Sequence, residues 1–204
     1  TDRIELKRRI NDNLEATAQT YFDSLFFKGD RTDCTLADIA IVNPVRQLAK
    51  GKIARCFEMA TLPTRGCIPT GDSLKAYNGG VRFTNGDTII ARITPCLENG
   101  KAAYINILND GEVAFGSTEY IVIRANPDIV YPEWLFYHIN TPSFIQGGKS
   151  HMTGTAGQQR IDINYVKQYQ VPIPSLEQQK IILDNISAER KLIESSKRLI
   201  DVFE

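Results

Sequence analysis

The chain has 204 residues, with 42% hydrophobic and 24% charged side chains, a composition typical of a folded protein with one sizeable domain and additional helices. Its 24 basic and 24 acidic residues cancel to a formal net charge of zero, so composition alone does not indicate a nucleic-acid partner. No apolar run approaches the roughly 20 residues that a membrane helix needs, and because the first residues are charged we expect no signal peptide.

The first predicted element is a long helix over residues 3–26. Its apolar side chains recur at spacings of four and seven, which places them on one side of a helix. Gly29 follows as a helix terminator. The side chains expected to pack along this side and to mediate oligomerisation include Ile10, Leu14 and Tyr21.

The middle of the chain is expected to hold a meander of short strands. Three runs are rich in β-branched or aromatic residues, namely Thr88–Ile93, Ala102–Ile107 and Tyr120–Arg124. Asn-Gly and Asp-Gly pairs lie between these runs and are typical of turns.

Two short helices are predicted after the strands. The first covers Glu133–Asn140, with Pro132 in its first turn, where a proline is tolerated. The second begins at Thr141-Pro142 and is expected to end at Gly147-Gly148. Strands and helices in this order indicate an α+β domain with long polar loops.

The segment Val171–Ile181 marks a change of structure. Pro172 and Pro174 alternate with apolar residues, which predicts an extended strand. Ser175 and Gln178 have the spacing of a capping box, so a helix is predicted from there to the chain end. Its apolar seam consists of Ile182, Ile186, Ile193 and Ile200. This seam either packs on its own domain or forms a coiled coil with another helix.

Several kinds of catalytic or metal site are excluded by spacing. The four cysteines form no Cys-x-x-Cys pair and only two histidines exist, so no metal site is expected. Scattered cysteines also fit a reducing cytoplasm. Gly147-Gly148-Lys149-Ser150 resembles the end of a phosphate-binding loop, but Ser143 stands where that motif needs a glycine. We find no catalytic constellation.

Polar loops rich in Thr, Ser, Asn, Gln and Arg join several predicted elements. They occupy residues 92–101, 116–119 and 153–160, with a basic segment earlier at residues 46–55. These side chain types can reach DNA bases and phosphates, and glycines let a backbone approach a ligand closely. Taken singly, each loop is also what an ordinary polar turn looks like.

The loops and their flanking segments together resemble a known family. The segments IELKRRINDNLEATAQTYFDSLF, NGDTIIARITPCLENGK, GSTEYIVIR, MTGTAGQQRI and VPIPSLEQQKI, in this order, closely resemble the specificity subunit of type I restriction–modification enzymes. The resemblance covers nearly the whole chain.

The resemblance implies a fold and a division into domains. It implies an α+β target-recognition domain at residues 28–174, with a twisted, mostly antiparallel sheet and short helices. Residues 1–27 and 175–204 would be long helices that form a coiled-coil spacer. A full subunit of this family has two recognition domains, so this chain is expected to be a half-subunit that dimerises or a fragment, the second half.

The resemblance also implies the function. The chain would be a non-catalytic, cytoplasmic subunit that reads one half of a bipartite double-stranded DNA target and docks methyltransferase and restriction subunits. S-adenosylmethionine, ATP and Mg would bind those partners, and this chain would bind no cofactor. Candidates for DNA contact are Arg46, Lys50, Lys52, Arg92, Asn99, Lys101, Ser117, Thr118, Thr153, Thr155, Gln158, Gln159 and Arg160.

Within that set, Gln and Arg are the candidates for base reading and Lys for phosphate contact. Glu119 is expected to orient a neighbouring arginine or to cap a turn. Two other function classes stay open at this point. One is a helical adaptor that binds proteins rather than DNA. The other is a metal-dependent nuclease that would use Asp87, Glu98 and Lys101, although their spacing does not match such sites.

Overall fold

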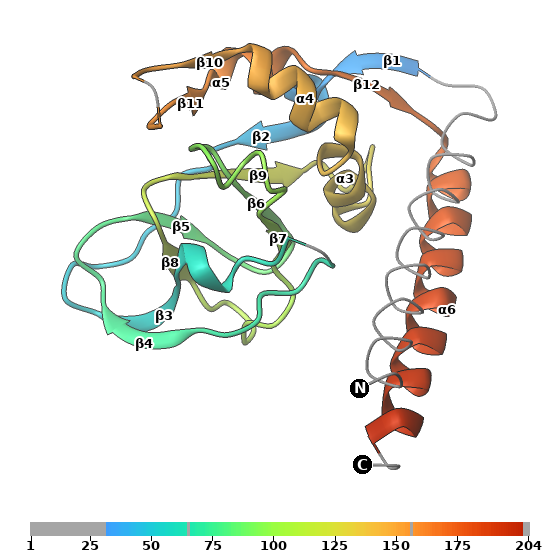
Figure 1. Ribbon diagram of the computed structural model, residues 1–204, viewed down its shortest axis with the longest axis horizontal. Coiled ribbons are helices and arrows are strands. Elements are labelled where there is room, and N and C mark those ends of the chain that lie inside the picture. Colours follow the sequence, from blue (N-terminus) through green and yellow to red (C-terminus); the bar gives the residue numbers. More distant parts are fainter. Residues whose placement is uncertain (1–31, 65, 156, 202–204) are drawn as a thin grey trace. The chain divides into compact units, whose positions relative to one another are not determined.

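The computed structural model describes residues 32–64, 66–155 and 157–201, and within the last helix it describes the side chains up to residue 188 and that of Lys191. Asp33–Pro172 form one compact unit, and the chain from Ile173 onward belongs to another (Figure 1). The helix predicted at residues 3–26, with Ile10, Leu14 and Tyr21, lies outside the described residues. The predicted domain boundaries stay predictions.

The first of two four-stranded sheets is entirely antiparallel. In spatial order it contains β2 (Ala40–Val42), β9 (Tyr120–Ala125), β6 (Asp87–Ala91) and β7 (Ala102–Tyr104). Every residue of β6 is buried. This explains why Ile89, Ile90 and Ala91 follow one another, with no alternation of apolar and polar residues. The three predicted strands are confirmed, although the first ends at Ala91 instead of Ile93 and the second at Tyr104 instead of Ile107.

The second sheet holds its strands in the order β4 (Ser73–Ala76), β3 (Ile53–Phe57), β8 (Ala114–Gly116) and β5 (Val81–Phe83). Its pair β3 and β8 is parallel, and its other pairs are antiparallel. The 3-10 helix η1 (Met59–Thr61) follows β3. The expectation of a simple meander was wrong, because the chain leaves β7, passes through β8 in this second sheet, and returns to pair β9 with β6.

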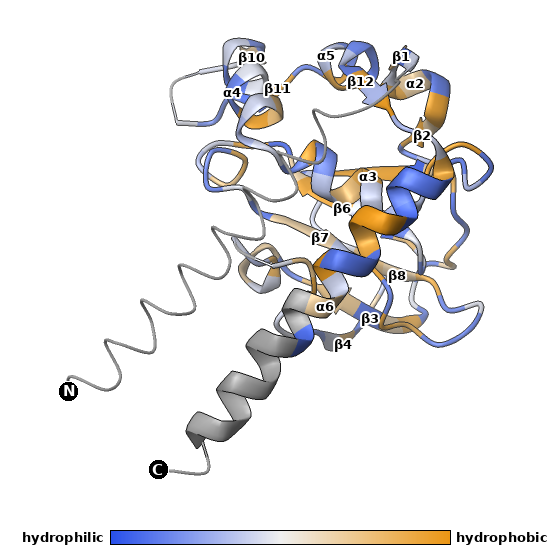
Figure 2. Cartoon of the chain, turned by 90° about the vertical axis from the view of Figure 1, so that its right-hand side faces the viewer, coloured by the Kyte–Doolittle hydropathy of each residue, from blue (hydrophilic) through white to orange (hydrophobic). Residues whose placement is uncertain are grey.

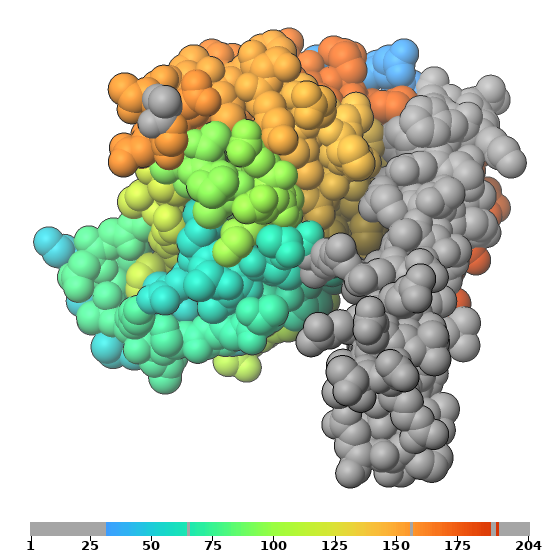
Figure 3. Space-filling view, in the orientation of Figure 1, coloured from blue at the N-terminus to red at the C-terminus, as the bar shows by residue number. Residues whose placement is uncertain are grey.

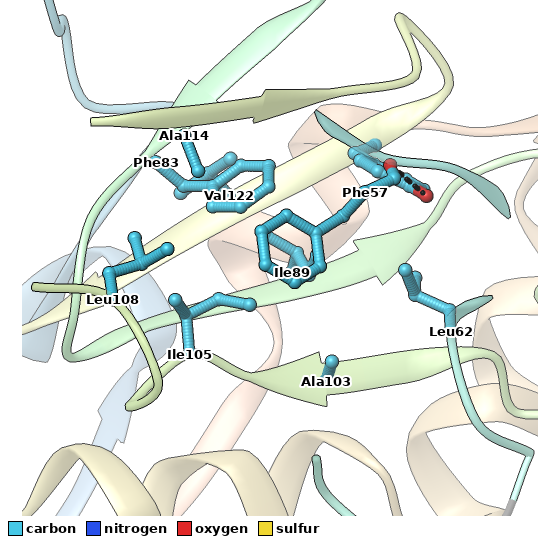
Figure 4. Packing of buried hydrophobic residues seen from close by; sticks show 10 residues of the cluster. Phe57, Leu62, Phe83, Ile89, Ala103, Ile105, Leu108, Ala114 and Val122 are labelled. Atoms are coloured by element: carbon cyan, nitrogen blue, oxygen red, sulfur yellow. Dashed lines mark hydrogen bonds between the residues drawn. The ribbon is translucent and has the colours of Figure 1, made fainter. Parts of the chain in front are cut away.

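The main hydrophobic core lies between residues of the two sheets (Figure 4). Phe57 and Phe83 from the second sheet are fully buried, as are Ile89 and Val122 from the first. The Tyr120 hydroxyl donates to the Phe57 carbonyl oxygen over 3.1 Å, so its polar atom is satisfied inside the core. Each of these large apolar side chains stabilises the fold by about 1.5–3 kcal/mol through burial.

Two short helices follow the sheets, as predicted. They are α3 (Pro132–Ile139) and α4 (Pro142–Ser150), each with a proline in its first turn. The Thr141 hydroxyl accepts from the Phe144 amide and caps α4. The helix does not end at Gly147-Gly148 as predicted, because these glycines serve close packing. A Cβ on Gly148 would lie 2.7 Å from the Ile161 side chain.

Two further sheets have two strands each. One pairs β1 (Thr32–Thr35) with β12 (Gln170–Ile173), and the other pairs β10 (Met152–Thr153) with β11 (Arg160–Ile161). The short helix α2 (Leu36–Ile39) follows β1, and α5 (Ile163–Gln168) precedes β12. Pro172 is tolerated in β12 because a two-stranded sheet leaves one edge of each strand unpaired.

The long helix α6 (Leu176–Asp201) begins as the sequence predicts. The Gln178 amide donates to the Ser175 hydroxyl over 3.3 Å, and the Ser175 amide donates to the Gln178 side chain over 3.2 Å, which confirms the capping box. Ile182 and Ile186 are 4% exposed. The side chains of Ile193 and Ile200 lie outside the described set. The coloured part of α6 in Figure 2 shows both apolar and polar residues. Among the described residues, no helical segment has the length and hydropathy of a membrane span.

Candidate nucleic-acid interface

Two of the predicted polar loops emerge side by side because of strand register. Strand β6 is antiparallel to β9, and Ala91 at the end of β6 pairs with Tyr120 at the start of β9. The loop that leaves β6 and the loop that enters β9 therefore meet at the same end of the sheet. The Arg92 amide donates to the Glu119 carbonyl oxygen over 2.9 Å and joins them.

The third polar loop, between β10 and β11, joins the same place. The Ile161 amide donates to the Arg92 carbonyl oxygen over 2.9 Å, and Ile93 forms an isolated bridge with Arg160. We call the combined surface the loop cluster, defined as the described residues of 92–101, 117–119 and 153–160. Figure 3 shows the green segment around residue 100 against the orange segment around residues 150–160.

Thr94 and Gln159 hold two of these loops together. The Thr94 amide donates to the Gln159 carbonyl oxygen over 3.0 Å, and the Gln159 amide donates to the Thr94 hydroxyl over 3.1 Å. The peptide bond between Thr94 and Pro95 is cis. The backbone of Gln159 is therefore anchored, while its side chain amide is left for other partners.

Arg160 forms an ion pair with Glu119 inside the loop cluster. Its Nε lies 3.1 and 2.9 Å from the two carboxylate oxygens, and its Nη2 lies 2.7 Å from Oε1. These hydrogen bonds, and then the charges of Arg160 and Arg92, hold the pKa of Glu119 below its ordinary value despite partial burial. The same carboxylate raises the pKa of Arg160. Glu119 thus orients an arginine, as the sequence suggests.

The remaining predicted residues of the hairpin loop are exposed. Thr153, Thr155 and Gln158 all face solvent, and the Gln158 amide donates to the Thr155 carbonyl oxygen over 3.0 Å. Gly154 has a φ of 122° and Gly157 a φ of 83°, values that glycine adopts most readily. These two glycines therefore let the backbone turn within the loop, and the polar side chains of the loop point to the solvent.

The loop before β9 presents Ser117 and Thr118. The Glu119 amide donates to the Ser117 hydroxyl over 3.1 Å, so Ser117 also stabilises the local turn. Thr118 is exposed. Both residues lie within the loop cluster, next to the Glu119–Arg160 pair.

Two residues on the first loop are placed differently from each other. Asn99 is exposed. Its backbone amide donates to the Pro95 carbonyl oxygen, and its side chain forms no hydrogen bond among the described residues. The Lys101 ammonium donates to the Met59 carbonyl oxygen over 2.8 Å. Lys101 therefore helps to hold the chain near η1, and this bond draws its charge away from the solvent.

Arg46 lies outside the loop cluster, in an ion pair with Asp87. Its Nη2 is 3.1 Å from Asp87 Oδ1, and Arg124 Nε is 2.6 Å from the same oxygen. The Thr84 amide also donates to Asp87, whose side chain is 0% exposed. Arg124 was missed by sequence reasoning, although its position opposite Asp87 follows from the β6–β9 register. Arg46 is thus engaged in the fold.

Lys50 and Lys52 are exposed on the turn before β3. The Tyr77 amide donates to the Lys52 carbonyl oxygen over 2.8 Å, and the Arg82 guanidinium lies 5.8 Å from the centre of the Tyr77 ring. Within the described chain, no hydrogen bond joins this turn to the loop cluster. Arg82, over the Tyr77 ring, is a further basic residue that sequence reasoning missed. Its place after Asn78-Gly79-Gly80 was the available signal.

A nuclease site is not assembled from Asp87, Glu98 and Lys101. Asp87 is buried and forms ion pairs with Arg46 and Arg124. Lys101 lies beside Ala91, at the opposite end of β6 from Asp87. A separation of four residues along a strand is about 13 Å. In the described ranges, no group of three His, Cys, Asp or Glu side chains could hold a metal ion.

Comparison with known proteins identifies similar sequences. The family described as type I restriction modification DNA specificity domain matches residues 64–204. The specificity subunit of the type I restriction enzyme EcoAI of Escherichia coli is 40% identical over 105 residues, which are 52% of this chain and 18% of that protein. The specificity subunit of EcoEI, also of Escherichia coli, is 32% identical over 154 residues, which are 72% of this chain and 26% of that protein.

Solved structures share the fold at low identity. A structure concerned with complex assembly and conformational transition of the type I R-M system gives a TM-score of 0.68 at 15% identity, covering 97% of this chain and 49% of that one. The HsdS subunit from Thermoanaerobacter tengcongensis gives 0.63 at 15% identity, covering 96% and 47%. The present chain therefore spans about half of these structures and a smaller share of the curated relatives.

Proposed function

This chain belongs to the type I restriction modification DNA specificity domain family, and on that premise we propose that it reads one half of a bipartite double-stranded DNA target. The observation that carries the proposal is the loop cluster, where strand register and hairpin contacts bring three polar loops together. Polar side chains on loops held by a rigid sheet are a common way to present contacts to a ligand.

The proposed contacts divide by chemistry. Gln158, Gln159 and Arg160 read bases, because an amide or a guanidinium can bond two atoms of one base edge. Asn99, Thr118, Thr153 and Thr155 add polar contacts around them. Lys50 and Lys52 contact phosphates, which positions the protein on the duplex without selecting a sequence. Arg46 and Lys101, engaged in internal bonds, act by holding the fold.

The helices supply a spacer in this proposal. In α6, Ile182 and Ile186 begin a seam that Ile193 and Ile200 continue at spacings of seven. Such a seam pairs with a second apolar helix. The proposed partners of α6 are the helix predicted at residues 3–26 and the corresponding helices of a second copy, or of the other half of a longer subunit. In a homodimer, twofold symmetry makes the complete target an interrupted palindrome.

Catalysis is proposed to belong to partner subunits. Methyltransferase and restriction subunits dock on this chain, and they would bind S-adenosylmethionine, ATP and Mg. Because the chain has no net charge, we expect its own affinity for random DNA to be weak. Partner subunits would then provide much of the sequence-independent binding.

Mapping methylated adenines in cells with and without this protein tests the proposal. Methylation of one bipartite sequence should disappear when the protein is removed and return when it is restored. Replacing Gln158, Gln159 and Arg160 together by alanine should alter the methylated sequence. An unchanged methylation pattern in all strains, with the purified chain retarding no DNA in a gel, would instead favour the adaptor that binds only proteins.

A further inference from the structure

The Glu119–Arg160 pair leaves a defined part of the guanidinium open. An arginine has five N–H groups in a planar fork. Nε and one hydrogen of Nη2 face the Glu119 carboxylate, and one hydrogen of Nη1 faces the Gln158 carbonyl oxygen at 3.3 Å. After these bonds among described residues, one hydrogen remains on each terminal nitrogen. The Arg160 side chain is 40% exposed, so these two donors can reach a ligand.

Two donors, one on each terminal nitrogen, suit a base with two neighbouring acceptors. Guanine presents N7 and O6 in the major groove, both acceptors. Adenine presents N7 beside an amino group, which would oppose one of the arginine donors. Resting on the proposed DNA-reading function, we propose that Arg160 reads a guanine in the half-site and that Glu119 is the positioning residue that sets its orientation.

The surroundings of the pair favour a base over a phosphate as the ligand. The Glu119 carboxylate repels a charged phosphate that approaches the guanidinium more strongly than it repels the uncharged edge of a guanine. Arg160 lies in β11, and its backbone is fixed by pairing with Thr153 of β10 and with Ile93. An arginine that is held at its backbone and along its Nε edge loses little further rotamer freedom when it binds, which favours affinity and selectivity.

Arg55 offers a matched control elsewhere in the fold. It also forms an arginine–carboxylate pair, with its Nη2 at 2.6 Å from Asp72, and its side chain is 20% exposed. It lies on β3 in the second sheet, outside the loop cluster. Arg55→Ala therefore removes the same chemical groups without touching the proposed reader.

The experiment selects bound duplexes from a library with a randomised segment, using the full chain, Arg160→Ala, Glu119→Gln and Arg55→Ala. The wild-type protein and Arg55→Ala should enrich the same motif, with one invariant guanine. Arg160→Ala should lose the preference at that guanine alone and keep the other positions. Glu119→Gln should show an intermediate preference there, because the guanidinium keeps its donors and loses its anchor.

A second measurement changes the base that the pair would read. Replacing the invariant guanine by 7-deazaguanine removes the N7 acceptor and keeps base pairing, so wild-type binding should weaken by about 5- to 150-fold. Arg160→Ala should bind both duplexes equally. If Arg160→Ala enriches the unchanged motif, or loses preference equally at all positions, the guanine assignment is overturned while the proposed function stands. Failure of the wild-type chain to enrich any motif would overturn the proposed function and, with it, the assignment.

Discussion

Asp87→Asn tests whether the buried ion-pair cluster is structural. The Asp87 side chain is 0% exposed, while those of Arg46 and Arg124 are 22% and 27% exposed. The substitution keeps the shape and removes the charge, so two part-buried guanidinium groups lose their counter-ion. Removing one partner of a buried pair costs about 3–5 kcal/mol. Since both arginines can gain water, we expect the lower end, about 3 kcal/mol of the free energy of unfolding.

Urea unfolding at neutral pH measures this loss, with Asp72→Asn as the control. Asp72 pairs with Arg55 near the surface, where an ion pair is worth about 0–1 kcal/mol. The loss in Asp87→Asn should change little with added salt, because buried charges are weakly screened. Equal losses in the two variants would refute the structural role of Asp87. Metal-dependent DNA nicking by the wild-type chain that Asp87→Asn abolishes without loss of stability would support the nuclease instead.

Three further results are expected. Burial lowers the pKa of His138 from 6.5 to about 4, so the neutral form stabilises the fold. The free energy of unfolding should therefore fall by about 2 kcal/mol between pH 7.5 and pH 5. Urea titrations should show no such fall in His138→Phe, and a fall that persists in this variant would contradict the assignment. Gly116→Ala should destabilise by about 1–3 kcal/mol, because its Cβ would lie 2.6 Å from the Phe57 carbonyl oxygen, whereas Gly71→Ala meets nothing within 4 Å; equal melting curves would contradict this. Lys50→Ala should weaken binding to all DNA sequences alike and reduce the slope of log affinity against log salt by about one, and a change in sequence preference would argue against a phosphate contact.

Local structure followed closely from local sequence. The β-branched runs became β6, β7 and β9, and Ser175 with Gln178 started α6, since both signals act over a few residues. The end of α4 was mispredicted because Gly147 and Gly148 look like terminators, while a contact with Ile161, distant in the sequence, decides their role. Packing partners of this kind are not visible in a single sequence.

The site was predicted by residue type and not by placement. The polar loops were identified from composition, but their convergence depends on the β6–β9 register and on the β10–β11 hairpin. Basic residues that look equivalent in the sequence have different places, with Lys50 exposed, Arg46 on buried Asp87 and Arg55 on Asp72. Burial and ion pairing arise from tertiary contacts, so charge alone could not separate them.

The most direct measurement compares binding of the full chain to its selected duplex and to a scrambled duplex of the same composition. The wild-type chain should prefer the selected duplex, and replacing Gln158, Gln159 and Arg160 together by alanine should abolish that preference while weak binding to both duplexes persists. Arg55→Ala should behave as wild type. Equal binding of the wild-type chain to both duplexes, or an unchanged preference in the triple variant, would contradict sequence reading by the loop cluster.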